Sequence, residues 1–277
     1  MIDLETPRRY EPRFVSLLRR RKRPKLLVSV RNGIEAAAAI SGGCNIIDVK
    51  DPDRGTLGYA GRETIEEVAK VASASSTDLS VALGEVLDWQ HRDVEPLPRS
   101  IRYGKLGLAG MGHDPNWINR LDDTRKRFDQ VGCEFNWITV AYADYQAAHA
   151  PHPQSVFDSA MQCGSAGILI DTWSKSSGTV FDCMGAKMLH AMMAHAHLLL
   201  RVGGLAGRIT LSQIPKAVSV HPSIIGVRSA ACRLGDRHQP VDEDAVRSVR
   251  RAIDSEELNT HPIDVIPESE IDNHPQW

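Results

Sequence analysis

The chain has 277 residues, of which 42% are hydrophobic and 25% are charged, and this globular composition excludes disordered and fibrous proteins. Its formal net charge of −2 supplies no overall positive field for a nucleic-acid partner. No apolar run approaches the roughly 18 residues of a membrane span, and the basic start lacks the apolar stretch of a secretory signal. We therefore expect a cytoplasmic protein that binds neither nucleic acid nor membranes.

The cysteines and histidines do not indicate a metal site. The cysteines are widely spaced and form no C-x-x-C pair, which is typical of thiols in a reducing compartment. They are Cys44, Cys133, Cys163, Cys183 and Cys232. The histidine groups at residues 149–152 and 190–197 have no neighbouring carboxylate or cysteine that would complete a ligand set. We therefore predict no metal.

The two ends of the chain carry opposite charges. Residues 8–25 include nine Lys or Arg, and residues 254–277 include seven Asp or Glu with no Lys or Arg. The basic run could contact an anionic partner, but we favour a solvated extension, the commoner meaning of such a run. The acidic end has the composition of a disordered or loosely docked tail. We accordingly divide the chain into a basic extension (1–24), a central domain (25–253) and an acidic tail (254–277).

Eight short apolar runs, each bounded by Gly, Asp, Asn or Pro, have the character of buried parallel strands. They cover residues 26–30, 45–49, 79–83, 101–106, 136–140, 167–170, 198–202 and 224–227. Helical patterns lie between most of them, at residues 33–40, 63–74, 116–131, 154–163, 185–195, 212–217 and 242–253. This alternation predicts an α/β fold, a (β/α)8 TIM barrel in a single domain. A doubly wound sheet is the alternative, but the count of eight and the lack of an early G-x-G-x-x-G motif favour the barrel.

In such a barrel the chemistry lies at the C-terminal ends of the strands. At the second run, Asp48 and Lys50 share one face because side chains alternate along a strand. Lys105 lies near the end of the fourth run. Asp171 follows the sixth run, and Lys175 comes four positions later, where one helical turn would bring it alongside. Since alternate strands supply one layer of a barrel interior, these side chains could converge at its mouth.

Three lysines near strand ends need an explanation, because lysine is rarely buried without a partner. A chemical explanation is Schiff-base formation with a carbonyl compound, which requires an amine whose pKa is lowered by burial or nearby cations. The other cations could hold a substrate phosphate, and Asp171 could move protons. The structural alternative is that each lysine lies in a loop and reaches solvent. This explanation is adequate for one lysine but weaker for three lysines at the ends of alternate strands.

The seventh and eighth runs lead into candidate phosphate-binding loops, the usual location of phosphate in these barrels. Gly204, Ala206 and Gly207 follow the seventh run, and Arg228 and Ser229 follow the eighth. Glycines allow backbone N–H groups to approach an anion, and an arginine can chelate phosphate with two hydrogen bonds. The glycines could equally form a tight turn into the next helix, and the two roles are compatible.

Several of these segments resemble one known family. Residues 46–52 (I-I-D-V-K-D-P), followed by 55–58 (G-T-L-G), resemble its D-V-K-[ND]-P-x-x-G-[ST]-L-G signature. Residues 103–108 (Y-G-K-L-G-L) resemble its second lysine segment, and residues 171–175 (D-T-W-S-K) resemble its D-T-x-x-K segment. Residues 205–207 (L-A-G) and 226–228 (G-V-R) match its last two loops. Over residues 25–250 the chain thus resembles the (5-formylfuran-3-yl)methyl phosphate synthases of methanofuran biosynthesis.

The resemblance implies a lyase-type synthase, a barrel that joins two molecules of glyceraldehyde 3-phosphate with loss of water and one phosphate. It implies that Lys50 is the Schiff-base lysine, that Asp171 and Lys175 are acid–base groups, and that Lys105 tunes charge or binds substrate. No cofactor is expected, because the iminium activates the substrate. Asp48 and the two phosphate loops are expected to bind substrate.

The chain departs from the family pattern at two positions: Arg208 stands where a serine is usual, and Ser229 stands where a glycine is usual. We expect Arg208 to face solvent and Arg228 to make the stronger phosphate contact. Two other functions remain open: another Schiff-base aldolase acting on a phosphorylated aldehyde, and a non-catalytic sugar-phosphate-binding homologue. We also expect the protein to form a homo-oligomer whose copy number the sequence does not give.

Overall fold

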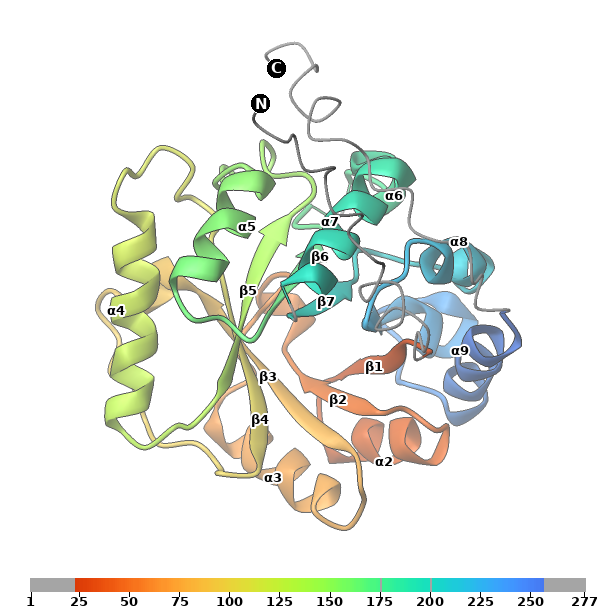
Figure 1. Ribbon diagram of the computed structural model, residues 1–277. Helices are drawn as coiled ribbons and strands as arrows, with labels where there is room; N and C mark the ends of the chain where they lie inside the picture. The colour runs from red at the N-terminus through yellow and green to blue at the C-terminus, as the bar shows by residue number, and fades with distance from the viewer. Residues whose placement is uncertain (1–22, 175, 200, 257–277) are drawn as a thin grey trace, which may run out of the picture.

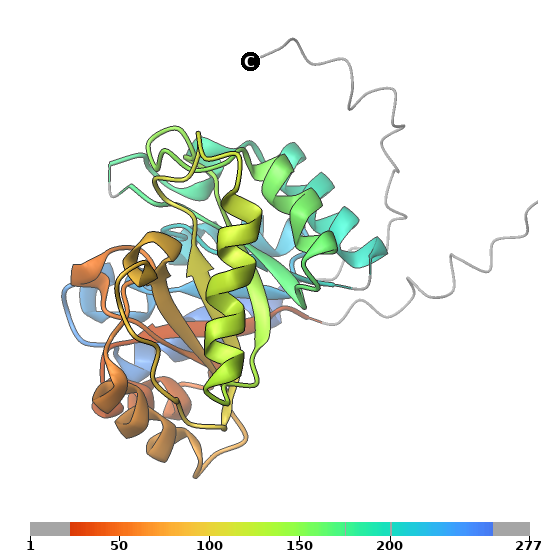
Figure 2. The ribbon, with the colours of Figure 1, turned by 90° about the vertical axis from the view of Figure 1, so that its left-hand side faces the viewer.

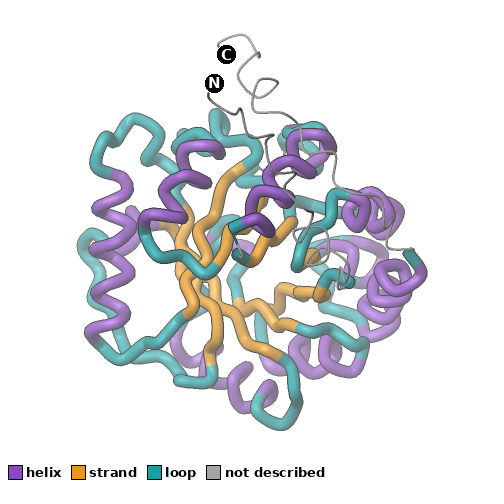
Figure 3. The backbone as a smooth tube through the Cα atoms, in the orientation of Figure 1, coloured by secondary structure: helices purple, strands orange, loops and turns teal. Residues whose placement is uncertain are grey.

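The computed structural model describes residues 23–174, 176–199 and 201–256, and within them eight parallel strands close into a barrel in sequence order. Figure 1 shows the ring of strands with helices around it, and Figure 3 shows the strands at the centre of the molecule and the helices at its periphery. The strands are β1 (Lys25–Val30), β2 (Ile46–Val49), β3 (Asp78–Glu85), β4 (Ile101–Gly107), β5 (Asn136–Tyr142), β6 (Gly167–Asp171), β7 (Val202–Leu205) and β8 (Ile224–Val227). The TIM barrel is confirmed, and the doubly wound alternative is wrong.

The helices pack their apolar stripes against the outside of the barrel. They are α2 (Gly33–Ser41), α3 (Arg62–Ala72), α4 (Trp117–Gln130), α5 (Pro153–Gln162), α6 (Val180–Cys183), α7 (Ala186–Leu198), α8 (Ile214–Ser219) and α9 (Glu243–Ser255). In the helix expected at residues 63–74, which is α3, the apolar stripe of Ile65, Val68, Ala69 and Ala72 is buried. Figure 2 shows α4 lying across the outside of the strands. None of the helices in the described residues is both long and apolar enough to cross a membrane.

Between β3 and β4 a 3₁₀ turn, η2 (Val86–Trp89), takes the place of a helix. The Trp89 ring is buried there, and its Nε1–H donates to the Leu83 carbonyl at 2.6 Å. The segment that follows contains Pro96 and Pro98, which cannot continue a helix. This unit therefore covers its side of the barrel with an indole ring and an irregular loop.

The seventh strand lies later in the chain than predicted. The expected strand at residues 198–202 is wrong: α7 continues to Leu198, and β7 begins at Val202. The error came from reading Gly203 and Gly204 as a turn, whereas both belong to the strand. A Cβ at Gly203 would lie 2.9 Å from the Met193 sulfur, so glycine permits α7 to pack closely on β7. Gly204 is therefore part of the barrel wall and not of a phosphate loop.

The barrel interior is apolar at its base and polar at its mouth. Leu27, Ile46 and Ile224 form a buried cluster inside the barrel. Because side chains alternate along β2, Asp48 and Lys50 follow Ile46 on the same inward face. The apolar base excludes water below these charges, and the open side of the site is therefore the C-terminal end of the barrel.

The predicted ends of the chain fall largely outside the described residues. Of the basic extension only residues 23 and 24 are described, and of the acidic tail only residues 254–256. Asp254 belongs to the last turn of α9 and pairs with Arg250 in the preceding turn at 2.8 Å. The folded domain thus continues slightly beyond the expected boundary at residue 253.

Candidate active site

The C-terminal ends of the strands surround a hollow that is open to solvent, and its empty space, the solvent-exposed part included, is about 720 Å³. Nine of the residues singled out from the sequence line it: Asp48, Lys50, Lys105, Asp171, Ala206, Gly207, Arg208, Arg228 and Ser229. Arg208 is exposed, as expected, but it also borders the pocket. Gly204 does not line it, in keeping with its place in β7. Lys175 lies outside the described residues. The structure therefore brings nearly all of the predicted set to one pocket.

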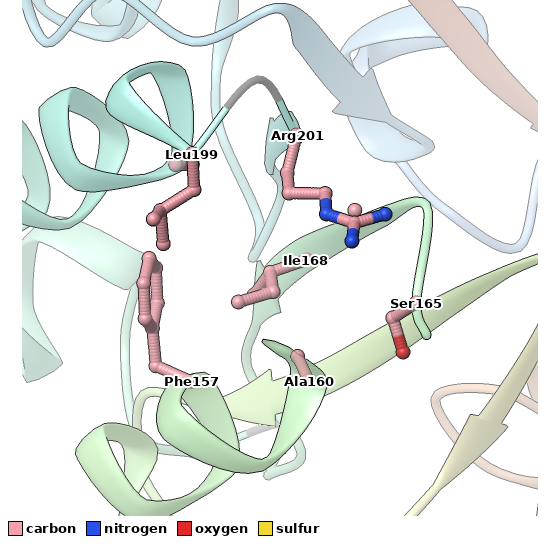
Figure 4. Close-up of a pocket in the computed structure, with 8 residues that line it drawn as sticks. Phe157, Ala160, Ser165, Ile168, Leu199 and Arg201 are labelled. Atoms are coloured by element: carbon pink, nitrogen blue, oxygen red, sulfur yellow. The ribbon is translucent and has the colours of Figure 1, made fainter. Parts of the chain in front are cut away.

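A second hollow, shown in Figure 4, lies between α5, β6 and the end of α7. Phe157, Ile168 and Leu199 line it, with Arg201 at its edge, and it is too small to hold a water molecule. It belongs to the packing between helices and barrel, and the mouth of the barrel is the site with room for a ligand.

A buried ion pair joins β2 and β4 at the bottom of the pocket. The Lys105 ammonium donates to Asp48 Oδ1 at 2.5 Å, and both side chains are at most 3% exposed. The Ser29 hydroxyl lies 3.5 Å from the other carboxylate oxygen of Asp48. Burial of either charge alone would be costly, so each stabilises the other in the barrel interior. Lys105 thereby presents a fixed positive charge at the base of the site.

The loop after β2 holds the Lys50 backbone firmly. The Lys50 N–H donates to the Val30 carbonyl at 3.1 Å, and the Asp51 N–H donates to the Gly58 carbonyl at 2.8 Å. A Cβ at Gly58 would overlap the carbonyl oxygen of Asp51, so only glycine allows this closure. The second half of the D-V-K-D-P-x-x-G-x-x-G segment therefore shapes the loop that carries Lys50.

Lys50 and Asp171 have shifted pKa values of opposite sense. Desolvation lowers the pKa of Lys50, with a contribution from the nearby Lys105 and Arg237, while Asp171 and Asp48 oppose the shift. Burial raises the pKa of Asp171, against the opposing effect of Lys50. Both shifts favour the neutral forms, a free amine and a protonated carboxyl. Those are the forms required for attack on a carbonyl and for donation of a proton.

The segment after Asp171 is held in place from two sides. Asp144, which follows β5, accepts hydrogen bonds from the backbone N–H groups of Trp173 and Ser174 at 2.7 and 2.8 Å. The Thr56 hydroxyl donates to the Trp173 carbonyl at 2.9 Å. The sequence analysis missed Asp144, although its place just beyond the fifth apolar run is the signal that identified Asp171.

Arg228 reaches the pocket wall, but its guanidinium is already occupied. It donates to both carboxylate oxygens of Glu35, at 2.5 and 3.0 Å, and to the Ser29 carbonyl at 2.9 Å. Arg31 binds the same carboxylate at 2.8 Å. Sequence reasoning missed Glu35, which lies in the first turn of α2. This geometry favours a structural role for Arg228 and does not support the direct phosphate contact expected for it.

We expect Arg228→Ala to lower the free energy of unfolding by about 3–5 kcal/mol, because it leaves the buried Glu35 carboxylate without its main partner. Arg31→Ala is the matched control: it removes the other, partly exposed partner of Glu35 and should cost only about 1 kcal/mol. Urea unfolding of the two variants at neutral pH compares these effects. Similar small losses would contradict a structural role for the Glu35–Arg228 pair.

The loss of stability in Arg228→Ala should depend on pH, because the Glu35 carboxyl of the Glu35–Arg228 pair titrates. Burial alone would raise the pKa of Glu35, but hydrogen bonds from Arg228 and Arg31 outweigh it and hold the pKa below its ordinary value. A depressed carboxyl pKa stabilises the fold above the unfolded-state pKa, and this contribution is lost as pH falls through the folded-state pKa. The stability difference between wild type and Arg228→Ala should therefore shrink below about pH 4.

The loop after β7 connects the pocket to α6. The Gly207 carbonyl accepts from the Val180 N–H at 2.9 Å, and the Ala206 N–H donates to the Ile170 carbonyl at 2.8 Å. Ser229 begins a short 3₁₀ turn, η4 (Ser229–Ala231). Within the described residues, no group of three or more His, Cys, Asp or Glu side chains is arranged to hold a metal ion.

Comparisons with known proteins agree with this picture. The 4-HFC-P synthase family matches residues 26–250. The (5-formylfuran-3-yl)methyl phosphate synthase of Methanococcus maripaludis (strain C5) is 30% identical over 230 residues, covering 81% of this chain and 97% of that protein. The enzyme of the same name from Methanopyrus kandleri is 28% identical over 222 residues, covering 78% and 93% respectively.

Among solved structures, thiamine phosphate pyrophosphorylase from Pyrococcus furiosus matches with a TM-score of 0.52 at 12% identity, covering 84% of this chain and 96% of that one. At that identity the likeness concerns the barrel fold alone. The family match is different in kind, because it runs from β1 into α9 and includes the lysine and aspartate segments that line the pocket. On this basis the chain belongs to the family of 4-HFC-P, or (5-formylfuran-3-yl)methyl phosphate, synthases.

Proposed function

We propose that the protein condenses two molecules of glyceraldehyde 3-phosphate to (5-formylfuran-3-yl)methyl phosphate through a Schiff base on Lys50. The observation that carries the proposal is the pair of Lys50 and Asp171 at the mouth of the barrel, with the amine pKa lowered and the carboxyl pKa raised. Membership of the synthase family supports the product, and a place in methanofuran-type cofactor biosynthesis follows from that product.

The first step in this proposal is attack of the neutral Lys50 amine on the aldehyde carbon of one triose phosphate. Loss of water from the carbinolamine gives an iminium, which withdraws electrons from the adjacent carbon. That carbon loses a proton to become an enamine and attacks the aldehyde carbon of the second molecule. The chain's own amine supplies the electron sink, so the mechanism requires neither a metal nor an organic cofactor.

Asp171 serves as the proton carrier in these steps. Its protonated carboxyl gives a proton to the departing hydroxyl, and the resulting carboxylate removes the proton from the carbon next to the iminium. We assign Lys175 a supporting acid–base role from its sequence motif alone. Burial lowers the pKa of the Lys50 amine, and the Lys105 charge adds to this shift, while Asp48, the ion-pair partner of Lys105, opposes it.

Incubation of the purified protein with glyceraldehyde 3-phosphate tests the proposal. We expect a furan aldehyde absorbance to appear together with inorganic phosphate, in equal molar amounts, and we expect the Lys50→Arg variant to form neither. A lysine adduct trapped by borohydride without a furan product would indicate an aldolase for another phosphorylated aldehyde. Failure to trap any adduct would indicate a non-catalytic sugar-phosphate-binding homologue.

A further inference from the structure

One charged group at the pocket has no partner that accounts for its position. Arg237 lines the hollow from the irregular segment between β8 and α9. Its Nε atom is buried, and no described residue accepts a hydrogen bond from it. A buried guanidinium nitrogen without an acceptor is unfavourable, so its retention at a pocket wall points to an acceptor that arrives with a ligand.

The charges around Arg237 specify what that ligand must be. Arg208 and Arg228 are close enough to lower the pKa of Arg237, after the larger effect of burial, and Asp171 acts in the opposite direction. Arg228 has its charge balanced by Glu35, as Lys105 has by Asp48. An anion in the pocket would therefore balance the charge of Arg237.

The segment that carries Arg237 is fixed by contacts of its own. An isolated antiparallel β-bridge between the backbones of Cys232 and Val241 closes this segment at its base. Arg228 donates weakly to the carbonyls of Arg237 and Gln239, at 3.4 and 3.3 Å, from the same guanidinium that binds Glu35. The backbone that carries Arg237 is thus held beside the pocket before a ligand binds, which reduces the entropy lost on binding.

We propose that Arg237 binds the phosphate group of a phosphorylated aldehyde substrate and that Arg228 positions it. This proposal rests on the proposed function, because the aldehyde must react with Lys50 while its phosphate contacts Arg237. It differs from the expectation drawn from the sequence, which assigned the phosphate contact to Arg228 itself. The chemistry of the group suits the task, since a guanidinium binds a phosphate through two parallel, charge-assisted hydrogen bonds.

Cyanoborohydride trapping of the Lys50 adduct separates phosphate binding from imine formation. Glyceraldehyde 3-phosphate and glyceraldehyde offer the same aldehyde with and without the phosphate. In Arg237→Ala, we expect the concentration for half-maximal trapping of the phosphorylated aldehyde to rise about 10- to 100-fold, the loss typical of a hydrogen bond to a charged group. Trapping of glyceraldehyde should change less than about 2-fold, because it makes no such bond.

Two further variants serve as controls for the trapping experiment. Arg237→Lys retains the charge without the planar fork and should lose part of the preference for the phosphorylated aldehyde. Arg233→Ala removes an exposed arginine of the same segment, paired with Asp242 at 3.5 Å, and should behave as wild type. Equal losses for both aldehydes in Arg237→Ala, or no loss for either, would overturn the proposal.

A second measurement does not depend on Lys50 chemistry. Titration of the protein with inorganic phosphate, followed by ³¹P NMR line broadening, should give binding that Arg237→Ala weakens at least about 10-fold and Arg233→Ala leaves unchanged. Phosphate binding unaffected by Arg237→Ala would refute the role of this arginine. If no aldehyde is trapped on wild type but phosphate binding depends on Arg237, the proposed function fails and the anion site stands.

Discussion

Replacement of Lys50 by arginine is expected to reduce furan formation by at least about 10³-fold, because the enzyme loses its covalent nucleophile. Arginine keeps the positive charge but stays protonated, so it cannot form an imine. The furan aldehyde absorbance measures turnover, and mass spectrometry after borohydride treatment measures the adduct. Both signals should disappear in Lys50→Arg.

The controls for this result separate chemistry from folding. Lys126→Arg makes the same exchange on the exposed side of α4, where Lys126 pairs with Asp122, and should leave turnover unchanged. Lys50→Met removes the amine while keeping the length of the side chain, and it should be as inactive as Lys50→Arg. Thermal unfolding should show all three variants folded. A Lys50→Arg enzyme with most of its turnover would exclude the covalent mechanism.

Asp171→Asn is expected to slow turnover by about 10²–10⁴-fold, the usual contribution of a positioned acid–base group. The adduct on Lys50 should nevertheless still form, because water can replace Asp171 as the proton donor to the carbinolamine hydroxyl. Asp171 acts to raise the pKa of Lys50, so its neutralisation leaves the amine no more protonated than before. A folded variant that traps substrate and turns it over slowly would therefore assign Asp171 to proton transfer.

Asp123→Asn, on the exposed surface of α4, provides the matched control for that exchange. It should leave both trapping and turnover unchanged. Normal turnover in Asp171→Asn would remove this carboxyl from the mechanism. Loss of trapping along with turnover would show instead that Asp171 is needed for imine formation.

The barrel could be predicted from the sequence because its strands are buried on both faces and therefore appear as short apolar runs. Seven of the eight runs overlap the observed strands almost residue for residue. The seventh failed because β7 contains Gly203 and Gly204, and the physical reason for Gly203 lies in the close packing of α7. The alternation of polar and apolar residues does not reveal that a helix packs so closely on a strand, so it could not predict glycine in this strand.

The convergence of Lys50, Lys105 and Asp171 followed from two regularities, the alternation of side chains along a strand and the contribution of alternate strands to one layer. Their chemical roles remain predictions. Glu35 and Arg237 could not be found in this way. Glu35 contacts Arg228 across a sequence separation of 193 residues, and Arg237 lies in an irregular segment without any period.

The Glu35–Arg228 contact also has a consequence for biosynthesis of the chain. It connects α2, near the beginning of the barrel, with the end of β8, so the ring closes only after nearly the whole domain has left the ribosome. Until then the mouth of the barrel is open to water, and Lys50 has the protonated amine of an ordinary surface lysine. Under the proposed mechanism, the Lys50 amine therefore gains its lowered pKa, and with it the reactivity toward aldehydes, only when the barrel has closed.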